Sequence, residues 1–116
     1  MNKLQHILML IFLDLDGTLI NTVHPDWKPY KDGQKDYPVS QISIFTGVKE
    51  FIASRKAKGN FLVIVSDSHP RYVNPISEML GVEALSLTDK SNNKKILEFL
   101  DSHPQYKQMV AEGNCL

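Results

Sequence analysis

Short apolar runs alternate along the chain with segments whose apolar residues recur at helical spacing. The first run, residues 7–13, is apolar throughout, which predicts a strand covered on both faces of a parallel sheet. Residues 61–65 and 84–87 predict two further strands, and residues 108–111 predict the opening of a fourth. The hydrophobic pattern therefore predicts a sheet built from short buried strands.

Three segments between these strands combine a helical pattern with residues typical of helix ends. The starts are Thr46, Pro70 and Asn92 or Asn93, and the ends are Gly59, Gly81 and His103-Pro104. Strands alternating with helices over short connections predict an α/β fold, a doubly wound three-layer sandwich with a mainly parallel central sheet. With 116 residues, the chain has room for a single domain, residues 1–116.

Residues 20–45 interrupt this alternation, and we call them the flap. They are polar and contain several residues that break regular structure, namely Pro25, Pro29, Gly33 and Pro38. We expect a loop with at most a short strand at residues 42–45. The aromatic residues Trp27, Tyr30 and Tyr37 are either packing groups or platforms for a substrate.

Charge and cysteine content narrow the function classes. Thirteen basic and thirteen acidic residues cancel and are scattered, so neither nucleic acid nor an anionic membrane is expected as the main partner. The apolar start is shorter than the ~20 residues of a membrane span and lacks a signal-peptide cleavage site. The single Cys115 cannot form an internal disulfide. A cytoplasmic protein is expected.

Two carboxylates follow the first predicted strand directly. Ligands of doubly wound folds bind at the carboxyl ends of strands, where Asp14 and Asp16 emerge beside Gly17, which permits a sharp turn. This spacing suits Mg²⁺, and one carboxylate is left to handle protons. An ordinary strand-to-turn transition is the alternative, because Asp, Gly and Thr are common in turns.

Residues 14–19, Asp-Leu-Asp-Gly-Thr-Leu after an apolar strand, resemble the first motif of the haloacid dehalogenase superfamily of phosphohydrolases. The resemblance implies that Asp14 attacks phosphorus, and that Asp16 protonates the leaving group and then activates water. It also implies a Mg²⁺ cofactor held by the Asp14 carboxylate and the Asp16 backbone carbonyl. The implied phosphate-binding residues are Leu15, Gly17, Thr18, Asp67 and Ser68.

The second and third family motifs have candidates in the expected places. Ser66 closes the strand at 61–65, and its hydroxyl and nearby N–H groups suit a transferring phosphoryl group. Plain helix capping is the alternative for residues 66–68. Lys90, Lys94 and Lys95 are candidates for the motif lysine, and we prefer Lys94, with Lys90 second, although exposed lysines at a helix start are common.

The fourth motif departs from the family pattern. It supplies further acidic metal ligands after the next strand, and here only Asn114, assisted by Glu112, stands in that position. The later acid and the last strand are missing from the sequence. We therefore expect that the final part of the core is missing and that the chain is the N-terminal part of a longer protein.

The resemblance predicts a hydrolase, a magnesium-dependent phosphatase that forms an aspartyl-phosphate intermediate on Asp14. The flap has no room for a cap domain, which resembles the capless branch of the family. We expect a phosphorylated small molecule as substrate, and a homo-oligomer if a sheet edge is exposed. His24, His69 and His103 lack metal-ligand spacing and are expected at the surface, with His69 near Ser66.

Two other functions stay open. One is a receiver-like signalling domain that accepts phosphate, for which Asp89 after the third strand is the candidate. The other is an inactive HAD-like fragment that binds metal or phosphate.

Overall fold

The computed structural model describes residues 8–22, 24–36, 41–87 and 93–116. It contains a three-stranded parallel sheet in the order β1-β2-β3. The strands are β1 (Leu10–Leu13), β2 (Phe61–Ser66) and β3 (Glu83–Ser86). The helices are the 3₁₀ helix η1 (Pro25–Trp27), α1 (Lys28–Lys31), α2 (Val48–Ala57), α3 (Pro70–Leu80), α4 (Asn93–Asp101) and α5 (Pro104–Ala111). Within the described ranges, no helix has the length and apolar character needed to cross a membrane.

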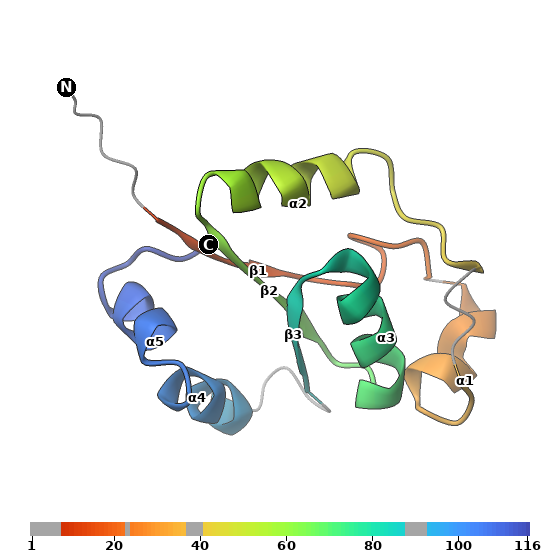
Figure 1. Cartoon of the computed structure of the whole chain (residues 1–116). Coiled ribbons are helices and arrows are strands. Elements are labelled where there is room, and N and C mark those ends of the chain that lie inside the picture. Colours follow the sequence, from red (N-terminus) through yellow and green to blue (C-terminus); the bar gives the residue numbers. More distant parts are fainter. Residues whose placement is uncertain (1–7, 23, 37–40, 88–92) are drawn as a thin grey trace.

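Helices cover both faces of the sheet, so the predicted α/β fold with a parallel sheet is confirmed at this coarse level. Ile11, Leu62 and Ile64 pack with residues of α2 and α3. The alternate positions Leu10 and Val63 pack with α5 and α4 on the opposite face. Figure 1 shows α4 and α5 together at one end of the molecule, whereas α1 lies beside α3 at the other end.

The C-terminal residues extend the sheet beyond β1. The amide of Leu10 donates to the Asn114 carbonyl over 3.0 Å, and a parallel bridge pairs Leu10 with Cys115. The spatial order is therefore residues 114–116, β1, β2, β3, and the chain reverses direction across the sheet after β3. The helices change face at the same point, as right-handed connections require. The reversal makes the carboxyl end of β1 the expected ligand position.

The prediction of a strand at 108–111 is wrong, because these residues form the second half of α5. Pro104 occupies the first turn of this helix, where its fixed φ angle favours helix formation. Gly113 then turns the chain with φ +79°, and strand-like pairing starts only at Asn114. The apolar run was too short to distinguish helix from strand.

The described part of the flap, residues 20–22, 24–36 and 41–45, contains two short helices that were not predicted, η1 and α1. Pro25 and Pro29 lie in the first turns of these helices, where a missing N–H costs nothing. The ends of the flap meet through an antiparallel bridge between Ile20 and Ile44. Thr46 is not the cap of the next helix, because α2 begins after Gly47, whose φ of +87° favours glycine.

Candidate functional site

The Asp14-to-Leu19 segment forms a tight turn at the carboxyl end of β1. The buried Leu15 anchors the turn, and its carbonyl accepts the amide of Leu19 over 2.9 Å. Gly17 has φ +78°, so the predicted glycine-dependent sharp turn is confirmed. Asp14 is exposed and accepts a hydrogen bond from the Thr18 hydroxyl over 3.2 Å. The turn thus directs one carboxylate toward solvent.

The Asp16 carboxylate is turned inward, with a side chain that is 20% exposed. Its Oδ1 accepts the hydroxyls of Thr22 and Tyr72, each over 2.5 Å, and its Oδ2 accepts the Ser68 hydroxyl over 3.1 Å. A hydroxyl can donate to a carboxylate and can equally accept from a carboxylic acid. These three partners therefore orient Asp16 in either protonation state, which suits a group that exchanges a proton.

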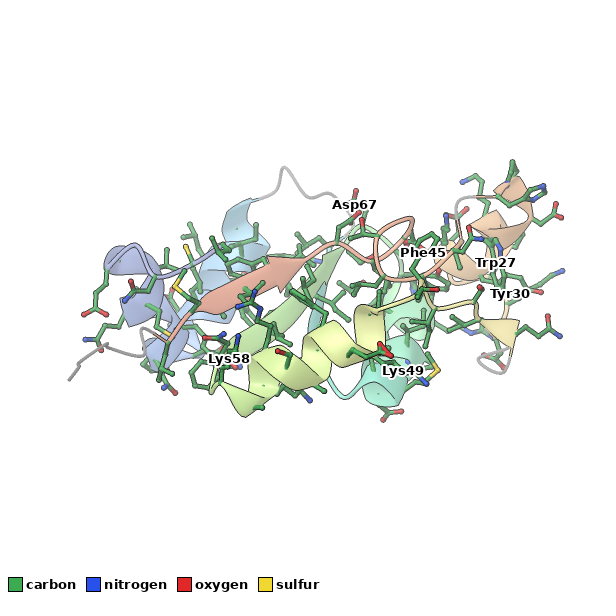
Figure 2. The ribbon with its side chains drawn as sticks, turned by 90° about the horizontal axis from the view of Figure 1, so that it is seen from above. Trp27, Tyr30, Phe45, Lys49, Lys58 and Asp67 are labelled. Carbon is green, nitrogen blue, oxygen red and sulfur yellow. The ribbon has the colours of Figure 1, made fainter. Side chains whose placement is uncertain are left out.

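Ser66, the last residue of β2, lies at the same edge of the sheet. The register pairs Leu13 with Ile64, so Asp14 and Ser66 follow on neighbouring strand ends. Ser66 is 2% exposed, and its Oγ accepts the Ser68 amide over 3.1 Å. The N-cap of α3 is His69 rather than Ser66, so the capping alternative does not account for Ser66. Asp67 is exposed on the loop between them, where Figure 2 labels it.

Lys31, which the sequence did not single out, is a cation that the structure brings to Asp16. Its Nζ lies 3.9 Å from Asp16 Oδ1, and its side chain is 23% exposed. The contact joins the flap to the turn at residues 14–19. No local pattern in the sequence predicts it. Tyr72 and Thr22 were also missed, although Tyr72 is spaced four residues from Ile76 on the buried face of α3.

Lys94 and Asn114 lie on other elements than the turn that carries Asp14 and Asp16. Lys94 is exposed on the first turn of α4, which follows β3, and β3 borders β2 rather than β1. Asn114 pairs with Leu10, four residues before Asp14, which is about 13 Å along a strand. The structure does not bring Asn114 to the predicted metal site, because α5 occupies the residues expected to lead into it. Lys90 lies outside the described residues, and Lys95 is exposed.

Two of the predicted Mg²⁺ ligands, Asp14 and Asp16, lie on the same turn. The exposed Asp14 carboxylate and the backbone of Asp16 offer hard oxygen donors, and Mg²⁺ often takes one or two protein oxygens and keeps several waters. In the part of the chain that the structure describes, no cluster of three His, Cys, Asp or Glu side chains is arranged as a metal site. Glu112 caps the C-terminal end of α5, remote from Asp14 along the sheet.

A cavity of about 360 Å³ opens between the flap and the loop after β2. It is lined by His24, Pro25, Lys28, Lys31, Asp32, Asp67 and Ser68. His24 also lines a second cavity of about 370 Å³, together with Trp27 and Tyr30, whose ring centroids are 5.6 Å apart. Both rings also pack against the core, and Figure 2 shows them on the flap. Tyr37 lies outside the described residues.

The histidines serve the local structure. His24 caps η1 and His69 caps α3, each through Nδ1 accepting an amide two residues later. Both are exposed, as predicted, and His69 stands three residues from Ser66. His103 is partly buried instead, because its ring stacks on Tyr106 and its Nε2 lies 2.9 Å from Glu83.

No protein-family model matches the chain, and no curated protein sequence matches it. The likeness to the haloacid dehalogenase superfamily therefore depends on the motif at residues 14–19 and on the residues placed around it.

Proposed function

We propose that this chain carries the nucleophile and the acid/base of a magnesium-dependent phosphomonoesterase of the haloacid dehalogenase type. The observation that carries the proposal is the divergence of two carboxylates two residues apart. Asp14 is exposed at the end of β1, whereas Asp16 points inward to three hydroxyl groups. This divergence supports a nucleophile paired with a separate proton carrier.

The reaction takes two displacements at phosphorus. The Asp14 carboxylate attacks in line, the P–O bond to the leaving group breaks, and Asp16 gives its proton to the departing oxygen. Asp16 then removes a proton from water, which attacks phosphorus, releases phosphate and restores the Asp14 carboxylate. Bound Mg²⁺ would supply charge neutralisation for the phosphate oxygens. Ser66 and the amides near it suit the role of holding the phosphoryl group.

The strand order supports this proposal over a receiver-like domain. Receiver domains have the flavodoxin-like order 2-1-3-4-5, in which the first strand lies between the second and third. Here β2 lies between β1 and β3, and residues 114–116 flank β1 on its other side. The candidate acceptor Asp89 lies outside the described residues.

The direct test is hydrolysis of para-nitrophenyl phosphate with and without Mg²⁺. We expect magnesium-dependent turnover that falls by about a thousandfold or more in Asp14→Asn. Asp101→Asn, which changes an exposed acid on α4, is the matched control and should retain full turnover.

Trapping with beryllofluoride separates the alternatives. Modification of Asp14 is expected, modification of Asp89 would favour the receiver-like function, and neither modification nor turnover would mean an inactive fragment. Either of the last two results overturns the proposal.

A further inference from the structure

We propose that the flap supplies the phosphate-binding cation of this site, Lys31, and that the 360 Å³ cavity beside Asp16 receives the phosphate group of a small phosphomonoester. The identity of the ligand as a phosphate ester depends on the proposed function. The placement of the cation depends on the contacts of Lys31 itself. The family resemblance alone had pointed to a lysine on α4 instead.

Lys31 and Ser68 connect the cavity to the Asp16 carboxylate. Both residues line the cavity, and both contact the Asp16 carboxylate from the flap and from the loop after β2. A phosphate group in the cavity therefore lies within reach of an ammonium and a hydroxyl, and next to the proposed acid/base. An ammonium and neutral hydroxyls are the groups that commonly bind phosphate oxygens.

The two lysines of the cavity differ in their partners. Lys28 Nζ is 2.8 Å from Asp32, one turn away on the same segment, and its side chain is 75% exposed. The 3.9 Å between Lys31 Nζ and Asp16 Oδ1 exceeds hydrogen-bond length, so this contact leaves the ammonium protons for phosphate oxygens. Lys31 is also far less exposed than Lys28, which strengthens its interaction with an anion.

The flap is fixed in a way that holds Lys31 in this position. The His69 amide donates to the Lys31 carbonyl over 2.8 Å. Arg71 donates from Nη1 to the Gly33 carbonyl over 2.9 Å and from Nε to Asp36 over 2.8 Å. Gly33 packs directly on His69, since a Cβ at position 33 would lie 2.5 Å from the imidazole Cγ. Figure 1 shows the resulting placement of α1 beside α3.

Binding of inorganic phosphate tests the inference without turnover. Trp27 is the single tryptophan of the chain and lies four residues from Lys31, so its fluorescence can report the titration. Lys31→Met should weaken phosphate binding about tenfold or more, and Lys31→Arg should keep most of the affinity. Lys107→Met, which removes an exposed cation on α5 away from the cavity, should change the affinity by less than about twofold.

The inference is overturned if the wild-type chain shows no saturable phosphate binding, if the affinity is unchanged in Lys31→Met, or if Lys107→Met causes an equal loss. The thermal midpoint of each variant checks that a loss of binding is not a loss of folding. Lys94→Met tests the competing lysine, and a larger effect there would move the cation to α4.

The same titration in Asp14→Asn separates the two proposals. We expect this variant to lose hydrolysis and to bind phosphate with the same dependence on Lys31. If the wild-type chain binds phosphate through Lys31 but hydrolyses no ester, the proposed function fails and the binding site stands.

Discussion

Two tyrosines on opposite faces of the sheet each donate a hydroxyl to a carboxylate, in very different surroundings. Tyr72 of α3 is fully buried, and its oxygen lies 2.5 Å from Asp16 Oδ1. Tyr106 of α5 is partly exposed, and its oxygen lies 3.0 Å from Glu83. The Tyr72 hydrogen bond joins the buried face of α3 to the candidate site, whereas the Tyr106 hydrogen bond joins α5 to the edge strand β3. Breaking the first should therefore cost more.

The hydrophobic core is also larger on the face that carries Tyr72 than on the face that carries Tyr106. The cluster beneath α2 and α3 contains twelve buried residues in the described part of the chain, and the cluster beneath α4 and α5 contains three. Partly exposed aromatic rings, Phe61, Phe99 and Tyr106, complete the smaller cluster. The site thus stands on the better packed face, and the other face should open first.

The largest effect is expected from a cavity in the larger cluster. Ile76 of α3 is fully buried, so Ile76→Ala should lower the free energy of unfolding by about 3 kcal/mol. Val110→Ala on α5, a partly buried position of the other cluster, should cost only about 1 kcal/mol. Urea denaturation of both variants gives the comparison. Equal losses would show that the two faces contribute alike.

The next largest difference in unfolding free energy is expected between Tyr72→Phe and Tyr106→Phe. Tyr72→Phe removes a hydrogen bond to a mostly buried carboxylate and should cost about 2 kcal/mol of unfolding free energy. Tyr106→Phe should cost less than about 1 kcal/mol, because water can reach Glu83. Chemical denaturation at neutral pH measures both. A greater loss in Tyr106→Phe would reverse the assignment of the site to the more stable face.

The sequence predicted the parts of this comparison that depend on local pattern. The apolar spacing predicted the strands at 61–65 and 84–87 and the helix between them. Gly81 was predicted to end that helix, and it does so with a φ of +67°. The exposed and inward orientations of Asp14 and Asp16 did not follow, because Tyr72, which holds Asp16, lies 56 residues away along the chain.

Other errors have the same origin in long-range structure. Residues 108–111 belong to α5 rather than to a strand, since their apolar residues suit either structure over so few positions, and Asn114 therefore pairs with Leu10. Lys31 lies in a segment expected to be a loop, and only the docking of α1 on α3 brings it to Asp16. Contacts of this kind leave no periodic signal.

Alkaline pH should weaken the smaller cluster selectively. Burial, then the hydrogen bond and charge of Glu83, raises the pKa of Tyr106 to about 12 from an ordinary value of 10.0. The folded chain favours the neutral phenol, so this contribution is complete below pH 10 and is lost as the pH rises toward 12. Solvent screening limits the effect to about 1 kcal/mol.

Stability curves of wild type and Tyr106→Phe across this pH range measure that effect. The wild-type chain should lose more unfolding free energy with rising pH than the variant does. Tyrosinate absorbance near pH 12 should show a late-titrating component that is smaller by one tyrosine in Tyr106→Phe. Parallel stability curves for the two proteins would contradict the prediction.

The smallest effect concerns two exposed ion pairs at opposite ends of the molecule. The hydrogen bond and the charge of Arg71 hold the pKa of Asp36 below its ordinary value of 3.8. The pair is therefore formed above pH 3.8, and its contribution is lost as the pH falls through the lower folded-state pKa. Asp36→Asn should leave the flap docked, because Arg71 still reaches the Gly33 carbonyl and His69 still binds Lys31.

Acid titration of Trp27 fluorescence distinguishes the two pairs. In the wild type we expect a small change in Trp27 fluorescence as Asp36 becomes protonated, because the ion pair between Asp36 and Arg71 restrains the segment that carries Trp27. This change should be absent from Asp36→Asn. Asp101→Asn breaks the similarly exposed pair between Asp101 and Lys107 on the other face, and its titration should match the wild type. If Asp36→Asn keeps the wild-type acid transition, the carboxylate plays no part in holding the flap, and the Gly33 carbonyl is the partner through which Arg71 acts.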